Sequence, residues 1–245
     1  RFLDEFDPQL IGVLYNRTGI EELLQKAPAY RPVFFDDLLV LYASNRHLPE
    51  LVAEHELHHV NPHNLLDDGR GTLEQRLRET QGILDEFPNS RRALHSITRL
   101  LIDQGEYERA LAFAERYRKT HPEDPNSHFL AGNAHEYLNR CEQAIPLFED
   151  AFDEATEDFK STLHRHMGSC FYVLKDFPSS FRHFEEAINT YSDPVEPQHR
   201  FQFALAAVAM GKEEKARTLL KHLLYSVDPS DTASIDKARA LLADL

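Results

Sequence analysis

The stretch that decides the fold is RRALHSITRLLIDQGEYERALAFAERYRKTHPEDP, residues 91–125. Its apolar residues recur at intervals of three, four and seven in two runs, which are separated by Asp103-Gln104-Gly105. Such spacing puts them on one face of a helix, and a short polar segment that contains glycine is typical of a turn. The stretch therefore predicts two amphipathic helices that fold back on each other, with Pro122 ending the second because proline cannot continue a helix.

The same pattern returns three times, over residues 126–158, 162–194 and 198–229. The predicted turns are Leu138-Asn139-Arg140, Lys175-Asp176 and Met210-Gly211, and Pro194 and Pro229 close two of the segments. A small residue recurs early in each second helix at spacings of 34, 36 and 36, at Ala110, Ala144, Ser180 and Ala216. One hairpin cannot bury its own apolar face, so a repeat of this length predicts a stack of hairpins that share a continuous core.

These segments resemble the tetratricopeptide repeat over roughly residues 90–229. In that family a small residue of the first helix allows close packing, and it corresponds here to Thr98, Gly132, Gly168 and Ala204. The second helices begin at Tyr107, Cys141 and Phe177 and carry an interlocking apolar residue at Ala114, Phe148, Phe184 and Leu220. The site usually held by a large aromatic contains Leu101, His135, Phe171 and Ala207, so two of the four depart from the pattern. The resemblance implies an all-α fold, a right-handed superhelical α-solenoid of antiparallel helix hairpins.

The remaining segments carry a looser helical pattern. Residues 8–28 read as two short helices and residues 33–60 as a longer pair, and both resemble degenerate repeats. The sequence thus predicts a degenerate helical-repeat region over 1–64, a linker plus a single helix over 65–89, repeats over 90–229 and a C-terminal capping helix over 230–245. Ile235, Ala238, Leu242 and Leu245 form the apolar stripe of that last helix.

Composition narrows the classes of partner. The chain has 245 residues and a net charge of −14, which disfavours nucleic acid because phosphates repel an acidic surface. It contains no apolar run long enough to span a membrane. The two cysteines, Cys141 and Cys170, favour reduced thiols over a disulfide framework. The first residue is Arg1 and not Met, so the compartment stays open: cytoplasmic is favoured, and periplasmic or membrane-tethered placement remains an alternative.

One motif raises the question of catalysis. His55-Glu56-Leu57-His58-His59 fits H-E-x-x-H, in which two histidines one helical turn apart bind zinc and the glutamate acts as general base. A chain with 14 histidines meets this pattern by chance with a probability of roughly 0.1. On a helix, the packing face of Ala53, Leu57 and Val60 would turn both histidines toward solvent. The sequence therefore predicts no enzyme, no catalytic residue, no resident metal and no cofactor, and it leaves open whether His55 and His59 bind a metal.

In the tetratricopeptide repeat the first helix of each hairpin lines a concave groove. The resemblance implies that a peptide or partner protein, with acidic and apolar character, lies against exposed aromatic and arginine side chains there, because these are typical of binding hot spots. The predicted groove residues are Arg92, His95, Arg99, Phe129, Asn133, Tyr137, Arg165, Ser169, Tyr172, Phe201 and Leu205. Packing of Phe129 and Phe201 between helices is the alternative for those two rings.

The predicted function is a non-catalytic scaffold for protein–protein interaction. The alternatives are the repeat-containing part of a larger enzyme and a zinc metalloprotease that uses the H-E-x-x-H stretch. Self-association of the repeats is a further option.

Overall fold

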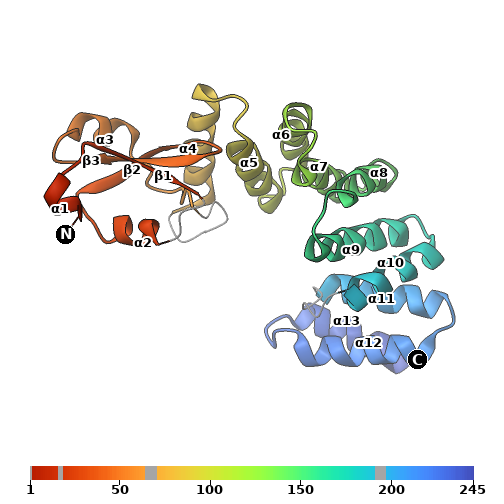
Figure 1. The fold of residues 1–245 in the computed structure, drawn as a ribbon. Coiled ribbons are helices and arrows are strands. Elements are labelled where there is room, and N and C mark those ends of the chain that lie inside the picture. The colour runs from red at the N-terminus through yellow and green to blue at the C-terminus, as the bar shows by residue number, and fades with distance from the viewer. Residues whose placement is uncertain (1, 16–18, 64–70, 191–196) are drawn as a thin grey trace. The chain divides into compact units, whose positions relative to one another are not determined.

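The computed structural model describes residues 2–15, 19–63, 71–190 and 197–245. They form two compact units, residues 1–121 and 122–245, and each is described by itself. Pro194, which the sequence predicts to close the third repeat, and residues 65–70 of the predicted linker lie outside the described residues. The first unit contains a small sheet and helices, and the second is helical throughout its described part (Figure 1).

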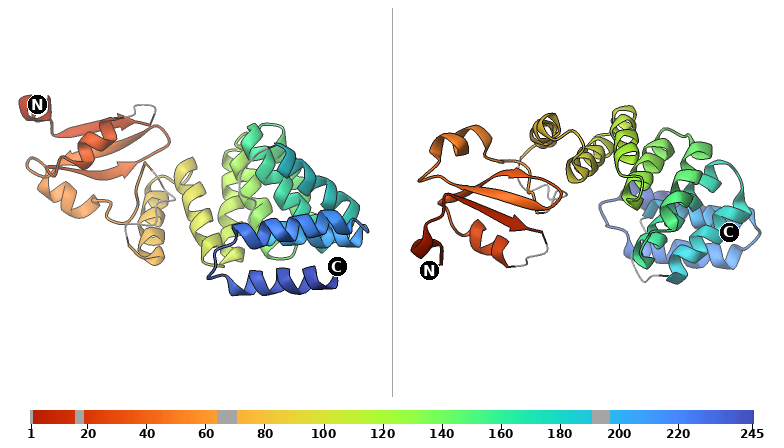
Figure 2. Two further views of the ribbon diagram at one scale, coloured as in Figure 1. Left: turned by 90° about the horizontal axis from the view of Figure 1, so that it is seen from below. Right: turned by 45° about the horizontal axis from the view of Figure 1, so that its top comes forward.

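The first unit begins with a three-stranded antiparallel sheet of order β1-β3-β2. The prediction of helices here was wrong for the three strands. They and the neighbouring helices are α1 (Phe2–Phe6), β1 (Leu10–Leu14), α2 (Ile20–Gln25), β2 (Tyr30–Phe35), β3 (Leu39–Ser44) and α3 (Pro49–His55). The helices of this region are short, and α3 contacts β2 and β3 while α2 lies over the other face of the sheet (Figures 1 and 2).

The reason for the strands is their composition and their long-range pairing. Residues 30–35 and 39–44 are rich in Val, Phe and Tyr, which favour extended backbone, and Asp36-Asp37-Leu38 lies between them. Asp36 Oδ1 accepts the N–H groups of Leu38 and Leu39 at 2.7 and 2.8 Å, which forms the turn. Pro32 lies on an edge strand, next to a shift in register, where a missing N–H is tolerated. The apolar residues of these short strands also fit a helical period, so the pattern alone did not distinguish the two.

Between the sheet and the first repeat lies α4 (Leu73–Glu86), the single helix that the sequence predicts in this region. It begins with a capping box, in which Thr72 Oγ1 accepts from Gln75 N and Gln75 Oε1 accepts from Thr72 N. The Glu79 carboxylate of α4 accepts the backbone N–H groups of His58, His59 and Val60, all at 2.9 Å. This helix therefore holds the segment that follows α3.

The four predicted hairpins are all present. Their helices are α5 (Arg91–Asp103) with α6 (Tyr107–Thr120), α7 (Pro125–Tyr137) with α8 (Cys141–Phe152), α9 (Glu157–Val173) with α10 (Phe177–Thr190), and α11 (Pro197–Ala209) with α12 (Glu213–Ser226). Every turn has one residue at positive φ, between 58° and 75°: Gly105, Asn139, Lys175 and Gly211. At each turn an N–H bonds back five residues, as from Arg140 N to His135 O at 2.9 Å. These are Schellman caps, which satisfy the last carbonyls of the first helix.

In each of the middle two hairpins, the two helices approach each other closely at a glycine of the first helix. A Cβ added at Gly132 would lie 2.6 Å from Cε1 of Phe148, and one added at Gly168 would lie 3.0 Å from the ring of Phe184. Both rings are fully buried. The small residues early in the four second helices are also fully buried, at Ala110, Ala144, Ser180 and Ala216. The sequence positions that carried the resemblance therefore form the packing contacts between paired helices.

The second unit ends with α13 (Thr232–Asp244), which packs against α12 and α11 (Figure 2). Ala238 is buried, and Ile235, Leu242 and Leu245 pack against the core that α10, α11 and α12 share. The predicted stripe is thus the packing face of this helix, which covers the end of the stack. The class is all-α apart from the small sheet, and the division of the chain at residues 64, 89 and 229 stays a prediction. Every helix among the described residues is too short or too polar to cross a bilayer.

Candidate functional site

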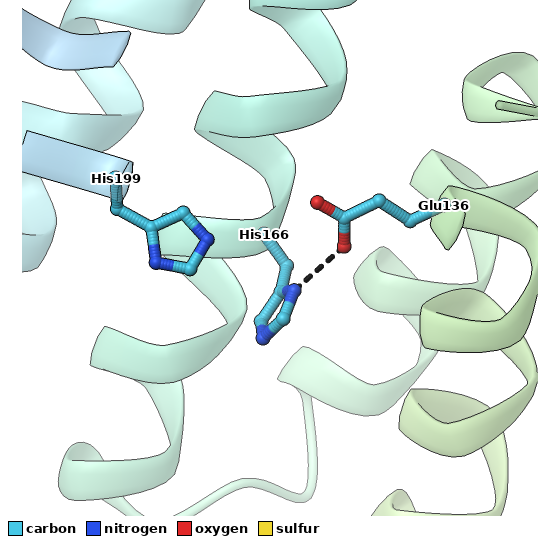
Figure 3. Close-up of side chains that lie close together, drawn as sticks. All are labelled: Glu136, His166 and His199. Atoms are coloured by element: carbon cyan, nitrogen blue, oxygen red, sulfur yellow. Dashed lines mark hydrogen bonds and ion pairs between the residues drawn. The ribbon is translucent and has the colours of Figure 1, made fainter. Parts of the chain in front are cut away.

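The candidate site lies in the second unit, where three successive first helices meet. α9 contacts both α7 and α11, and each of the three contributes one side chain to a cluster: Glu136 from α7, His166 from α9 and His199 from α11 (Figure 3). The Glu136 carboxylate and one ring nitrogen of each histidine lie within 4.8 Å of one another. Stacking of the repeats therefore brings together groups that are 30 and 33 residues apart in the sequence.

The cluster is largely closed to solvent. The side chains of Glu136 and His166 each keep 14% of their surface exposed, and His199 keeps 3%. The shortest contact joins Oε2 of Glu136 to Nδ1 of His166 at 2.6 Å. Such a short distance is typical of a hydrogen bond that involves a charge. The cluster is thus a largely buried polar network with a small exposed part.

Glu136 is held in its ionised form. Burial by itself raises the pKa of the Glu136 carboxyl, but the electrostatic attraction of His166 and the hydrogen bonds from His166 and Ser169 outweigh it. The pKa of Glu136 is consequently below its ordinary value. An anionic carboxylate next to two imidazoles is a set of donor atoms that binds protons, cations or the N–H groups of a ligand.

Aromatic rings surround the histidines. The ring of His166 lies 5.2 Å from that of Phe129 and 5.6 Å from that of Phe148, and the ring of His199 lies 6.3 Å from that of Phe184. Nδ2 of Asn133 is 3.4 Å from Nδ1 of His166. Rings on these sides lower the local dielectric and fix the orientation of both imidazoles.

Three of the predicted groove residues in this unit are buried, which corrects the expectation that they are exposed. Phe129 packs against Phe148 and Phe159, so the alternative of interhelical packing holds for it. Asn133 and Ser169 are buried beside the cluster, since stacked neighbouring helices cover the centre of the face. Tyr137 is 44% exposed, and the remaining four are partly exposed: Arg165, Tyr172, Phe201 and Leu205.

The other three predicted groove residues lie in the first unit and have partners there. The Arg92 guanidinium stacks 3.7 Å above the centroid of the Tyr15 ring and donates to Pro62 O at 2.9 Å. It therefore joins α5 to the sheet region and is not available as predicted. Nε of Arg99 lies 3.4 Å from Oδ1 of Asp103, and the His95 ring contacts that of Tyr117 edge-on at 6.4 Å.

The H-E-x-x-H stretch does not have the geometry of a zinc protease. α3 ends at His55, and Glu56 is extended with ψ at 127°, so His59 is not one helical turn along from His55. Glu79 instead fixes the backbone of residues 58–60. In the described part of the chain, the cluster of Glu136, His166 and His199 is the one group of three side chains with metal-binding spacing.

Two other features have some of the properties of a site. His164 and His183 face each other with their Nδ1 atoms 2.9 Å apart, but among the described residues no third imidazole, thiol or carboxylate completes a metal-binding set with them. An apolar pocket of 740 Å³ lies between α1, α2 and β1, but of its charged lining residues Arg46 is paired with Asp7 at 3.2 Å. The three-helix cluster is the stronger candidate.

The sequence places Glu136 on the first-helix side but suggests no role for His166 or His199. Alignment of the repeats does not group the three residues, because Glu136 follows Gly132 by four positions whereas His166 precedes Gly168 by two and His199 precedes Ala204 by five. Adjacent helices in the stack are offset, so unequal positions come into contact. The cluster could have been found by comparing α7, α9 and α11 with their repeat positions shifted relative to one another, instead of aligned at the same position.

Comparison with known proteins supports the fold. Residues 97–158 match the family model of the tetratricopeptide repeat. The chain is similar to TTC0263, a thermophilic TPR protein of Thermus thermophilus, with a TM-score of 0.56, 20% identity, and coverage of 69% of this chain and 91% of that one. It is similar to MamA of Desulfovibrio magneticus RS-1, with a TM-score of 0.55, 17% identity, and coverage of 64% and 86%.

A third similar structure is YrrB, a TPR protein with an unusual peptide-binding site, with a TM-score of 0.52, 15% identity, and coverage of 68% of this chain and 84% of that one. At these identities the similarity concerns the fold alone. A search of curated protein sequences gives no match.

Proposed function

We propose that this protein is a non-catalytic scaffold that binds a peptide segment of a partner protein across α7, α9 and α11, because residues 97–158 match the family model of the tetratricopeptide repeat. The repeat fold favours protein or peptide partners, since stacked first helices present an extended surface to a ligand. YrrB, one of the similar structures, is a TPR protein with a peptide-binding site, and the proposal extends binding of that kind to this chain.

The proposed surface is named the first-helix face and consists of Tyr137, Arg165, Tyr172, Phe201 and Leu205. The observation that carries the proposal is a pair of contacts between neighbouring first helices. Ser169 bonds to Glu136, and Asn133 lies 3.4 Å from His166. These contacts support the view that the repeat positions around them form one continuous side of the stack.

The chemistry of the first-helix face suggests the partner. Tyr137 offers exposed ring surface, Tyr172 and Phe201 offer the part of their rings that does not pack against the core, and Leu205 adds an aliphatic side chain. Arg165 donates to Oγ1 of Thr162 at 2.8 Å and keeps further N–H groups on its fork-shaped guanidinium for a carboxylate. Aromatic and arginine side chains are enriched in binding hot spots. The favoured ligand is therefore a segment with apolar residues next to an acidic one.

The test uses the whole chain and two substitutions on the first-helix face. Affinity capture followed by mass spectrometry identifies partners, and synthetic peptides from the captured protein are then titrated by calorimetry. We expect Arg165→Glu and Tyr172→Ala each to weaken peptide binding by at least about tenfold, which corresponds to roughly 1.4 kcal/mol.

Matched controls come from second helices of the same unit. Arg182 of α10 and Tyr225 of α12 are exposed, the latter to 94%, so Arg182→Glu and Tyr225→Ala change the same residue types away from the face. Melting curves establish that all four variants are folded. Equal loss of binding in the control pair, or normal binding by both variants of the face, contradicts the proposal.

A further inference from the structure

Packing of three helices requires only apolar side chains, but Glu136, His166 and His199 place a carboxylate and two imidazoles together. Two imidazoles and one carboxylate are the ligands that bind zinc in many sites with three protein ligands, and they also suit other divalent first-row transition metals. Each donor comes from a different helix, and the three ligand atoms lie within 4.8 Å of one another. We infer that these three side chains bind a single divalent transition metal ion, independently of any peptide.

The distances allow this with side-chain movement alone. Ligand atoms around a tetrahedral Zn²⁺ with bonds of about 2.0–2.2 Å lie roughly 3.3 Å apart. The contact of 2.6 Å between Glu136 and His166 therefore opens by about 0.7 Å, and the widest separation closes by up to about 1.5 Å. Rotations about the terminal χ angles of Glu and His produce shifts of this size, because these torsions are broad.

The surroundings are those of a metal centre and not of an exposed acidic patch. All three side chains are largely buried, and their ligand atoms converge from three helices. Asn133 and Ser169 lie in the next layer, beside His166 and Glu136, and such outer partners orient metal ligands. The rings of Phe129 and Phe148 shield one side of His166, which keeps competing water away.

Three protein ligands leave a coordination position for water or for a group from outside. Residual exposure of Glu136 and His166 gives access from solvent. A bound ion would also join α7, α9 and α11 and thus stabilise the second unit against unfolding, since a ligand that binds the folded state alone shifts the equilibrium toward it. Metal binding is therefore visible both as stoichiometry and as a rise in melting temperature.

The experiment titrates Zn²⁺ into the metal-free whole chain, purified without a histidine tag, by calorimetry and by competition with a chromophoric chelator. We expect one tightly bound Zn²⁺ per chain and a higher melting temperature. Glu136→Gln, His166→Gln and His199→Gln should each weaken the binding by more than about 100-fold, because loss of an outer partner alone costs about 10–100-fold. Circular dichroism without metal checks that the variants are folded.

Two double variants serve as controls for the other histidines. His164→Gln with His183→Gln removes the histidine pair, and His55→Gln with His59→Gln removes the H-E-x-x-H stretch, and both should bind Zn²⁺ as the wild type does. Absence of stoichiometric Zn²⁺ binding by the wild type overturns the inference. Unchanged binding by Glu136→Gln and His166→Gln also overturns it, and so does loss of binding in either control.

A measurement on the wild type needs no substitution. Crystals grown with Zn²⁺ should show an anomalous peak about 2.0–2.2 Å from the ligand atoms of Glu136, His166 and His199. A peak at other histidines with none at the cluster contradicts the inference, even if the three variants fail to fold. Failure of peptide binding leaves this result unaffected, so the two proposals are tested separately.

Discussion

The β1-β3-β2 sheet and the hairpins α5–α12 are stabilised by contacts of different range. Each hairpin is closed locally by a Schellman cap at its turn, and the middle two also by contact of a glycine with a phenylalanine ring of the second helix. The sheet instead pairs Leu10 with Ala43, and its connection to the repeats uses Asp37, which bonds to α5 more than fifty residues later. The same local cap, repeated four times, makes the hairpins recognisable in the sequence, whereas the sheet also depends on contacts between residues that are distant in the sequence.

The largest expected effect tests the close contact between paired helices at Gly132. In Gly132→Ala the new Cβ would lie 2.6 Å from the buried Phe148 ring, so the two helices must separate. We expect a loss of about 1–3 kcal/mol in the free energy of unfolding, the usual cost of overpacking. Urea denaturation of the whole chain measures it.

Gly82→Ala is the matched control, because Gly82 lies in α4 with nothing within 4 Å of an added Cβ. That change should raise the free energy of unfolding by about 0.5–1 kcal/mol, since alanine loses less backbone entropy than glycine in a helix. If both substitutions shift stability in the same direction, close packing at Gly132 is not what holds the hairpin.

A smaller effect tests the long-range connection. Asp37 accepts the N–H groups of Arg91 and Arg92 at 3.0 and 2.9 Å and the hydroxyl of Ser90 at 3.2 Å. Its carboxylate lies at the N-terminus of α5, where a negative charge is favourable. Asp37→Ala should therefore lower the free energy of unfolding by about 1–2 kcal/mol, as loss of a helix cap does.

Asp85→Ala provides the comparison for that change. Asp85 is exposed and bonds to Gln81 within the same helix, so its removal should alter stability by no more than about 0.5 kcal/mol. Hydrogen exchange at the first amides of α5 gives a local measure, and unchanged exchange in Asp37→Ala would show that Ser90 caps the helix without help.

The smallest effect near pH 7 comes from the third hairpin, where His164 of α9 faces His183 of α10. Burial, followed by the charges of His164 and Arg182, lowers the pKa of His183 to about 4, although Asp176 acts in the opposite direction. Burial also lowers the pKa of His164, with Arg182 acting in the same sense and Glu186 against it. Both imidazoles are therefore neutral in the folded protein near pH 7.

Below the ordinary histidine pKa of about 6.5 the unfolded chain binds more protons than the folded one. Stability should consequently fall as the pH is lowered from about 6.5 toward 4. His183→Gln should flatten this dependence, and urea midpoints measured from about pH 7.5 to about pH 4.5 test it. An identical slope in the variant and the wild type would assign the acid sensitivity to other groups.

The sequence by itself determined the repeats. The helices and their turns were predictable because each depends on residues within one hairpin, where helical spacing and small residues leave a periodic trace. The final helix was predictable for the same reason.

Only the tertiary structure decided the sheet, the three-residue cluster and which of the predicted groove residues are buried. Strands of five or six residues with mixed apolar spacing are compatible with a short helix, so pairing determined the sheet: β2 pairs with β3 across the turn at residues 36–38, and β1 pairs with β3 over thirty residues of sequence. The cluster of Glu136, His166 and His199 arises from the offset between stacked helices, and the burial of Phe129 and Asn133 arises from the neighbours that cover them. Local spacing determines which face of a helix is apolar, and packing determines which residues of different helices meet.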